Sequence, residues 1–315
     1  MNSLEGIKFK KKHIISGIGI IAFIVISFIL TCGDAFGLFS FRDVFNACGL
    51  KEFSYNAEDY PMSVHVLDVG KADSIFITCE GKNVLIDAGE HNIYNYVNEY
   101  LRKMGVKTID FLMLSHQHSD HAGGMSAIVE EFNINKFMMP KLRDDMIPTF
   151  RSYEKLLMAL ERKRISVSEP VPGTSFNVGK MSIEIFAPNN QYSDMNDNSI
   201  VTKVTYKNKS FLFTGDAGRH SENDMIAKGF NLKSDVLKVG HHGSRTSTTQ
   251  QFLNSVAPKY AVISVGADRN NLPKKETVDR LKRNNINLYR TDLDGTVIFL
   301  TDGDKMEVIT EKEGK

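Results

Sequence analysis

Short apolar runs separated by glycine-containing turns make up most of the chain from Val64 onward. Runs of this length predict strands, and longer stretches with apolar residues at helical spacing predict helices. In the first half the predicted strands are Val64–Val69, Ser74–Thr78, Asn83–Ile86 and Asp110–Leu114, and the predicted helices are Ile93–Met104 and Ala122–Phe132.

The second half repeats this order of strands followed by alternating helices. The predicted strands are Met181–Phe186, Ile200–Tyr206, Ser210–Thr214, Val236–Val239, Tyr260–Val265 and Thr296–Leu300, and the predicted helices are Ser221–Gly229, Thr248–Val256 and Lys275–Asn284. Two such halves favour two sheets packed face to face with helices on the outside.

An uncharged apolar segment, Ile14–Thr31, precedes this body. As a helix it would span about 27 Å, enough for the hydrocarbon core of a membrane. Four lysines precede it and Asp34 follows it, a charge bias that places the N-terminus in the cytoplasm. We therefore expect a basic N-terminus at 1–13, a transmembrane anchor at 14–32, a linker at 33–60 and an extracytoplasmic body at 61–311. A cleaved signal peptide and a lipoprotein signal acylated at Cys32 remain alternatives, and both also place the body outside.

Charge and cysteine content narrow the function classes only slightly. The formal net charge is +1, so no global charge draws the chain to nucleic acid or anionic lipid. The three cysteines are too few and too scattered for a disulfide framework or a zinc knuckle.

Three histidines and an aspartate fall within six residues directly after the predicted strand Asp110–Leu114, namely His116, His118, Asp120 and His121. In an extended segment His116 and His118 point the same way, while Asp120 and His121 fall where the chain turns into a helix. Imidazole and carboxylate together suit zinc, manganese or iron. The motif thus offers two ligands to each of two neighbouring metals, and Gly123 and Gly124 let the helix pack close to the sheet.

Two further strand ends carry candidate ligands. Asp216 ends the apolar run before it, at the edge where ligands bind in layered α/β folds. His241 and His242 follow the strand Val236–Val239 in the string Gly-His-His-Gly-Ser. Ser244, like Ser247 and Thr248, precedes a predicted helix and is expected to cap it, the alternative being that it presents the helix N-terminus to an anion.

Several of these strings resemble the metallo-β-lactamase superfamily, and within it the extracellular hydrolase domain of ComEC-type DNA-uptake proteins. The matching residues run in family order from about 62 to 302 and are Leu67–Ser74, Leu85–Gly89, His116–His121, Asn198-Ser199, Thr214–Asp216, Val239–Ser244, Arg290–Asp292 and Gly295. The resemblance implies a four-layer αββα sandwich with a two-metal site at the sheet edges.

The resemblance also implies roles for the motif residues. His116 and His118 would bind one of two divalent metals, Zn or Mn, with Asp216 as a bridge. Asp120 and His121, with His241, would hold the second, while Asp120 is also essential for turnover. His242, Ser244 and Asn198 would steady substrate oxygens or donate to the leaving group, although the sequence leaves open which of the paired histidines is the ligand. Asp68, Asp73 and Asp87 are expected to orient ligands or close turns.

The chain departs from the family pattern at two places. No histidine lies between Ala122 and Gly215, where metallo-β-lactamases supply a third histidine to the first metal. The first metal would therefore have an open position that oxygens of a substrate such as a phosphodiester can fill. This argues against a β-lactamase. Leu272 stands where related chains carry a histidine before the proline, which predicts reduced or altered activity.

The sequence therefore predicts a membrane-anchored phosphodiesterase that uses a metal-bridged hydroxide. Its predicted substrates are nucleic-acid or nucleotide diesters, DNA among them. Phosphocholine-type esters of the cell envelope come next as substrates, followed by lactones and thioesters. A degenerate surface binding module is the alternative from another class, and stoichiometric metal would separate it from an enzyme.

Overall fold

The computed structural model describes residues 59–267 and 271–312. The predicted anchor at 14–32 and nearly all of the predicted linker lie outside these residues. Within the described part of the chain, no helix is long and apolar enough to cross a membrane.

The first sheet has eight strands, in the spatial order β17-β16-β1-β2-β3-β5-β7-β8. Its strands are β1 (Met62–Val66), β2 (Ile75–Cys79), β3 (Lys82–Ile86), β5 (Phe111–Met113), β7 (Phe137–Met138), β8 (Val167–Ser168), β16 (Val297–Thr301) and β17 (Met306–Thr310). The pairings of β3 with β5 and of β5 with β7 are parallel, so these strands end at the same edge of the sheet.

The second sheet has seven strands, in the order β15-β14-β13-β12-β11-β10-β9. Its strands are β9 (Ser175–Val178), β10 (Met181–Ala187), β11 (Val201–Tyr206), β12 (Lys209–Phe213), β13 (Val236–Lys238), β14 (Tyr260–Ile263) and β15 (Asn287–Arg290). The four strands from β12 to β15 are parallel, so their carboxyl ends also meet at one edge.

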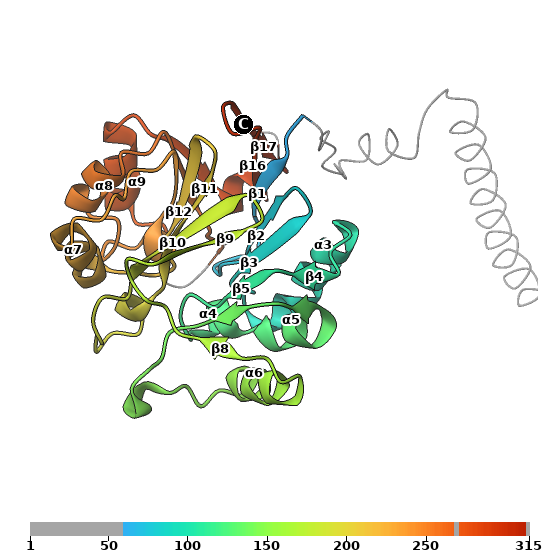
Figure 1. Cartoon of the computed structure of the whole chain (residues 1–315). Coiled ribbons are helices and arrows are strands. Elements are labelled where there is room, and N and C mark those ends of the chain that lie inside the picture. The colour runs from blue at the N-terminus through green and yellow to red at the C-terminus, as the bar shows by residue number, and fades with distance from the viewer. Residues whose placement is uncertain (1–58, 268–270, 313–315) are drawn as a thin grey trace, which may run out of the picture. The chain divides into compact units, whose positions relative to one another are not determined.

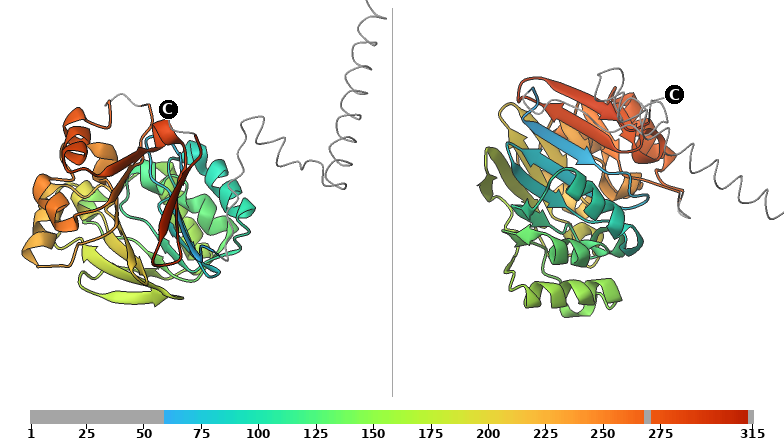
Figure 2. Two further views of the ribbon diagram at one scale, coloured as in Figure 1. Left: turned by 90° about the horizontal axis from the view of Figure 1, so that it is seen from above. Right: turned by 90° about the vertical axis from the view of Figure 1, so that its right-hand side faces the viewer.

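The helices divide between the outer faces of the two sheets, as Figures 1 and 2 show. Those that cover the first sheet are α3 (Tyr94–Lys103), α4 (Ser119–Ala122), α5 (Met125–Glu131) and α6 (Arg151–Arg162). Those that cover the second sheet are α7 (Arg219–Ala227), α8 (Gln250–Val256) and α9 (Lys275–Arg283). A last short helix, α10 (Thr291–Asp294), connects β15 to β16, and β4 (Thr108–Ile109) pairs with β6 (Asn133–Ile134) in a separate two-stranded sheet.

Three apolar clusters hold these four layers together. Val84 and Ile86 of β3 face the core between the sheets, whereas Leu85 faces the helices. In the second sheet Phe211 of β12 faces the central core, and Leu212 faces α7 and α8. Because both faces of each central strand are buried, these strands read as continuous apolar runs rather than as alternating patterns.

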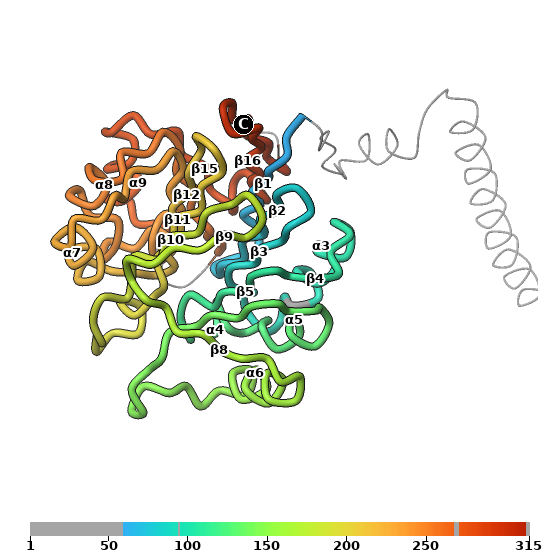
Figure 3. Tube along the Cα trace, in the orientation of Figure 1, coloured from blue at the N-terminus to red at the C-terminus, as the bar shows by residue number. Residues whose placement is uncertain are grey.

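The expected αββα arrangement is therefore observed, but its division into two sequence halves is wrong at the C-terminus. β16 pairs with β1, with Met62 opposite Thr301, and β17 extends that sheet at its edge. Figure 3 shows this last part of the trace lying beside β1, at the other end of the sequence. Hydrophobic periodicity identifies a strand but does not specify which edge it joins, because that choice depends on long-range packing.

Candidate metal centre

The three segments that carry the candidate ligands meet where the two sheets face one another. His116 follows β5, Asp216 follows β12, and His241 and His242 follow β13 in the short 3₁₀ turn Gly240–Gly243. β5 runs parallel to β3, and β12 runs parallel to β13, so the strands of each sheet end at one edge. The layered fold therefore brings together residues that lie more than a hundred positions apart.

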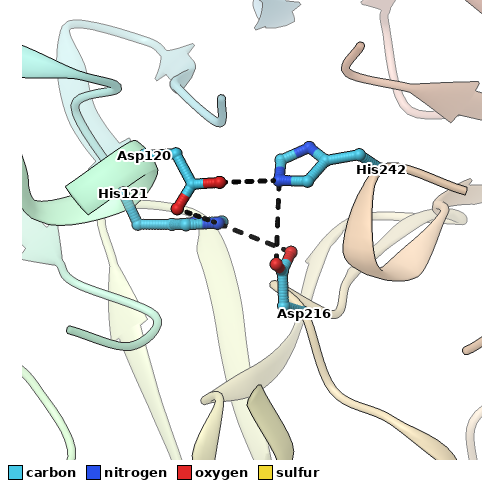
Figure 4. A group of neighbouring side chains, drawn as sticks. All are labelled: Asp120, His121, Asp216 and His242. Atoms are coloured by element: carbon cyan, nitrogen blue, oxygen red, sulfur yellow. Dashed lines mark ion pairs between the residues drawn. The ribbon is translucent and has the colours of Figure 1, made fainter. Parts of the chain in front are cut away.

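Asp120, His121, Asp216 and His242 form a buried cluster in which one ligand atom of each lies within 4.8 Å of the others. His242 Nε2 lies 3.3 Å from Asp120 Oδ2 and 3.6 Å from Asp216 Oδ2. His121 Nε2 lies 3.4 Å from Asp216 Oδ1. Figure 4 shows these side chains converging on one point from the two sheets. His242, rather than the predicted His241, therefore completes the group that contains Asp120 and His121.

Hydrogen bonds on the far side of each ring fix how these imidazoles face the cluster. His121 Nδ1 donates to Asp87 Oδ2 over 2.8 Å, and His242 Nδ1 donates to the Ser264 carbonyl over 2.9 Å. A ring whose Nδ1 carries the proton presents an unprotonated Nε2, the form that binds a metal. Both Nε2 atoms accordingly face the carboxylates.

Backbone conformation at the cluster departs from what these residue types prefer. His241 and His242 have φ values of 49° and 51°, and Asp87 has φ of 59°. Left-handed backbone costs a non-glycine residue roughly 1–2 kcal/mol. Strain of this kind persists where the surrounding structure imposes it, often at functional sites. Here it aims the ring of His242 between Asp120 and Asp216.

The electrostatics of the cluster call for a cation. Burial lowers the pKa of His121, but the charges of Asp216, Asp87 and Asp120 outweigh it and hold that pKa well above its usual value. Burial raises the pKa of Asp216, yet the neighbouring imidazoles of His242, His121 and His116 hold it well below the usual range. The buried carboxylates thus remain charged and need positive charge nearby.

Three buried ligand atoms have no hydrogen-bond partner among the described residues: His121 Nε2, His242 Nε2 and Asp216 Oδ1. Leaving such atoms unsatisfied is costly, and native proteins rarely do so. All three point into the same cluster, and nitrogen and carboxylate oxygen are suitable ligands for zinc and similar metals. The residues therefore fit a divalent metal.

His116, His118 and His241 lie beside this cluster. The rings of His116 and His118 are neighbours, with His116 Nε2 2.9 Å from His118 Nδ1. His116 Nε2 lies 4.0 Å and His241 Nε2 lies 3.7 Å from the same Asp216 Oδ2. His241 is a quarter exposed, whereas His116 is fully buried. These three imidazoles form a second group: His116 and His241 approach the Asp216 oxygen that His242 also approaches, and His118 adjoins His116.

The other two predicted site residues are engaged elsewhere. The amide of Asn198 donates to the carbonyls of Tyr192 and Asp194 and accepts from Tyr192 N, which holds its own loop together. Ser244 Oγ accepts from Thr246 N and contacts the Thr246 hydroxyl. Among the described residues, neither side chain forms a hydrogen bond with Asp120, His121, Asp216 or His242.

The structure gives outcomes for the predicted helix caps, for Leu272 and for the two glycines. The residue that caps α8 is Thr249, whose side chain accepts from Phe252 N, and not Ser244, Ser247 or Thr248. Leu272 packs against the core under α8 and α9. Both glycines allow the close packing that was predicted, because a Cβ on Gly123 would lie 2.4 Å from His91 N and one on Gly124 would lie 2.2 Å from the Ala88 carbonyl oxygen.

The sequence did not reveal two lysines that form ion pairs at or beside the candidate metal centre. Lys71 Nζ pairs with Asp120 Oδ2 over 2.5 Å, and its side chain is 27% exposed. Lys238 Nζ lies 2.9 Å from Asp73 Oδ2, and both side chains are buried. A lysine in the middle of an otherwise apolar strand was the available signal for Lys238, because buried lysines are almost always paired.

Comparison with known proteins agrees with this geometry. Residues 67–267 match the model of the metallo-beta-lactamase superfamily. Competence protein ComA of Neisseria gonorrhoeae is 31% identical, over 78% of this chain and 34% of that protein. ComE operon protein 3 of Bacillus subtilis is 28% identical, over 75% of this chain and 32% of that protein. The chain thus spans about a third of the length of these curated relatives.

Two solved structures share the fold at low sequence identity. The metallo-β-lactamase fold protein YhfI from Bacillus subtilis has a TM-score of 0.52 and 11% identity, covering 76% of this chain and 100% of that one. CmlA, a diiron β-hydroxylase from Streptomyces venezuelae, has a TM-score of 0.53 and 12% identity, covering 77% and 54%. At these identities the likeness concerns the fold alone.

Proposed function

The chain belongs to the metallo-β-lactamase superfamily, and we propose that it is a phosphodiesterase that cleaves nucleic-acid or nucleotide diesters outside the cell membrane. That it is a metallo-hydrolase related to competence proteins follows from the family match and the relatives. The observation that carries the proposal is the convergence of Asp120, His121, Asp216 and His242 with their ligand atoms unsatisfied.

The donor set suits two divalent ions, Zn or Mn. Asp120, His121 and His242 would hold one ion, and His116 and His118 the other, with Asp216 shared between them. His241, at the edge of the second group, would complete the set in place of the third histidine that the segment from Ala122 to Gly215 lacks. Bound ions of this kind supply Lewis acidity and lower the pKa of bound water.

Residues around the ligands orient the two imidazoles and add a positive charge. Asp87 and the Ser264 carbonyl hold the rings of His121 and His242 in one tautomer, so their Nε2 atoms stay available. Lys71, partly exposed beside Asp120, brings a positive charge to the mouth of the site. A phosphodiester is negatively charged throughout the reaction, and the Lys71 ammonium at this position would stabilise that negative charge.

Location and substrate class rest on two further observations. The apolar segment at 14–32, with lysines before it, supports a single-pass anchor that leaves the body outside the membrane. The similar proteins in Neisseria gonorrhoeae and Bacillus subtilis bear competence names, which supports DNA as a substrate of this chain.

A substrate panel tests the proposed reaction. The full-length chain, loaded with Zn or Mn, is offered bis(p-nitrophenyl) phosphate, p-nitrophenyl phosphate, a chromogenic cephalosporin and a homoserine lactone. We expect the diester to be hydrolysed with a kcat/KM at least about tenfold above any other, a difference of about 1.4 kcal/mol in transition-state binding. Turnover of only the lactone or the cephalosporin would reject the phosphodiesterase.

A further inference from the structure

Two cavities flank the metal centre and differ in chemistry. One, of about 420 Å³, shares Asp216 and His241 with the centre and is otherwise lined by polar residues that include Arg219 and Arg245. The other, of about 330 Å³, includes Lys71, the partner of Asp120, together with Tyr96 and Asn92. We call them the arginine cavity and the Tyr96 cavity. Each cavity shares a residue with the centre or with a partner of the centre, so each is a candidate site for the parts of a substrate beside the scissile bond.

The arginine cavity has positive charge available for a ligand. The Arg219 guanidinium has no hydrogen bond or ion pair within the described residues, and the side chain is exposed. Arg245 lies 3.6 Å from Glu276, but both side chains are more than 60% exposed, so this pair is weak. Guanidinium groups bind phosphate oxygens in pairs through their fixed fork of donors.

Three carboxylates line the arginine cavity beside the two arginines, but none of them pairs with a guanidinium among the described residues. Asp197 is buried and accepts from Gly218 N, Ser221 N and His220 Nδ1. Asp194 accepts from Asn196 N, and Asp216 faces the metal centre. The forks of Arg219 and Arg245 are therefore available to an anion.

The Tyr96 cavity favours a base over a phosphate. Its lining includes Asp68, which pairs with Lys312, and Glu90, which accepts from the Ser119 hydroxyl. The remaining lone pairs of these carboxylates can accept hydrogen bonds from amino groups of a base. Tyr96 is 38% exposed there, and a tyrosine ring provides a stacking surface for bases. The arginine cavity, by contrast, has no Phe, Tyr or Trp in its lining, so it lacks the aromatic cage that binds a quaternary ammonium such as choline.

We propose that the substrate is a single nucleic-acid strand, with the phosphate next to the scissile diester bound by Arg219 and Arg245 and a base stacked on Tyr96. This inference rests on the proposed function, because it assumes that the scissile diester lies at the metal centre. Phosphate contacts carry no sequence information, so the enzyme cleaves with little sequence preference.

Binding measurements test the inference without requiring turnover. A fluorescein-labelled oligodeoxycytidylate is titrated with the full-length chain in an Asp120→Ala background, which prevents cleavage, at several salt concentrations. Each phosphate contact to a single strand contributes about 0.7 to the slope of log K against log salt. We expect Arg219→Ala with Arg245→Ala to lower this slope by about 1.4. Arg151→Ala, an exposed arginine that begins α6 as Arg219 begins α7, should leave it unchanged.

A second variant and a competitor separate a nucleic-acid strand from other polyanions. Tyr96→Leu should weaken binding roughly fivefold or more, the effect of losing one stacked base, without changing the salt slope. Poly(glycerol phosphate) should compete poorly, because it has no bases. An unchanged slope in the double arginine variant, or equal competition by poly(glycerol phosphate), would overturn the inference. Hydrolysis of bis(p-nitrophenyl) phosphate by the same full-length chain, without the Asp120 change, reports separately on the proposed function.

Discussion

The Nδ1 atom of His121 lies 2.8 Å from Oδ2 of Asp87, and both side chains are fully buried. Asp87 also accepts from the backbone N–H and the hydroxyl of Ser115, each over 2.7 Å. One carboxylate therefore ties the end of β3 to the end of β5 and orients a ring of the metal centre. The same contact links fold stability to metal affinity.

Replacing Asp87 by Asn should weaken metal binding about tenfold to a hundredfold. The amide oxygen can still accept from Ser115 N, but the amide NH₂ would donate to His121 Nδ1 and leave the proton on Nε2, facing the cluster. Competition with a chromogenic zinc chelator measures the affinity. Asp110→Asn, at the other end of β5, serves as the control, since Asp110 accepts from Asn83 N far from the ligands. Equal affinity in Asp87→Asn and the unaltered chain would remove Asp87 from the metal centre.

Lys238 and Asp73 form a buried ion pair that joins β13 to the loop before β2. Lys238→Met should lower the free energy of unfolding by about 3–5 kcal/mol, because it leaves the buried Asp73 carboxylate without its lysine partner. Urea denaturation measures this loss, and adding Asp73→Asn should recover much of it. The control is Lys275→Met. Lys275 is exposed and pairs with Asp279, so this change should leave the urea midpoint of unfolding nearly unchanged. A Lys238 variant as stable as that control would contradict the assignment.

His65 makes the fold sensitive to acid. Burial lowers the pKa of His65 to about 3, whereas an unfolded chain titrates this residue near 6.5. The unfolded state therefore binds a proton that the folded state does not, and stability falls as the pH drops from about 6.5 toward 3. One such group contributes about 1.4 kcal/mol per pH unit to the slope.

His65→Gln should remove that part of the slope. Glutamine can retain a hydrogen bond to the Ser63 or Tyr100 hydroxyl but does not titrate. Urea denaturation of the unaltered chain and of His65→Gln, at about pH 6 and about pH 4 in the same buffers, gives the change in unfolding free energy with pH for each protein. Parallel slopes would show that His65 is not the responsible group.

The strands were predictable from sequence where both faces are buried. Asp110–Leu114 and Ser210–Thr214 nearly coincide with β5 and β12, because continuous apolar runs bounded by turns leave few alternatives. β15 and β17 were missed, since they are edge strands with partly exposed residues. Helix α6 was also missed, although Tyr153, Leu156 and Leu160 follow helical spacing and are buried.

The metal centre was predictable in its members but not in its pairings. Local spacing placed Asp120 and His121 together, and family order brought in Asp216. The choice between His241 and His242 depended on a left-handed backbone at both residues and on the Ser264 carbonyl, features that emerge only when β13 and β14 are packed side by side. Asn198 holds its own loop, and in sequence such an amide looks the same as one that binds substrate.

Metal-dependent hydrolysis of bis(p-nitrophenyl) phosphate tests the central claim most directly. The full-length chain is stripped of metal and titrated with Zn or Mn, beside Asp120→Ala and the exposed control Asp145→Ala. We predict turnover that appears with metal and saturates near two equivalents. Asp120→Ala should lose more than the tenfold to hundredfold typical of residues that only support a ligand, and Asp145→Ala should lose nothing. Turnover without metal, or undiminished turnover in Asp120→Ala, would contradict the account.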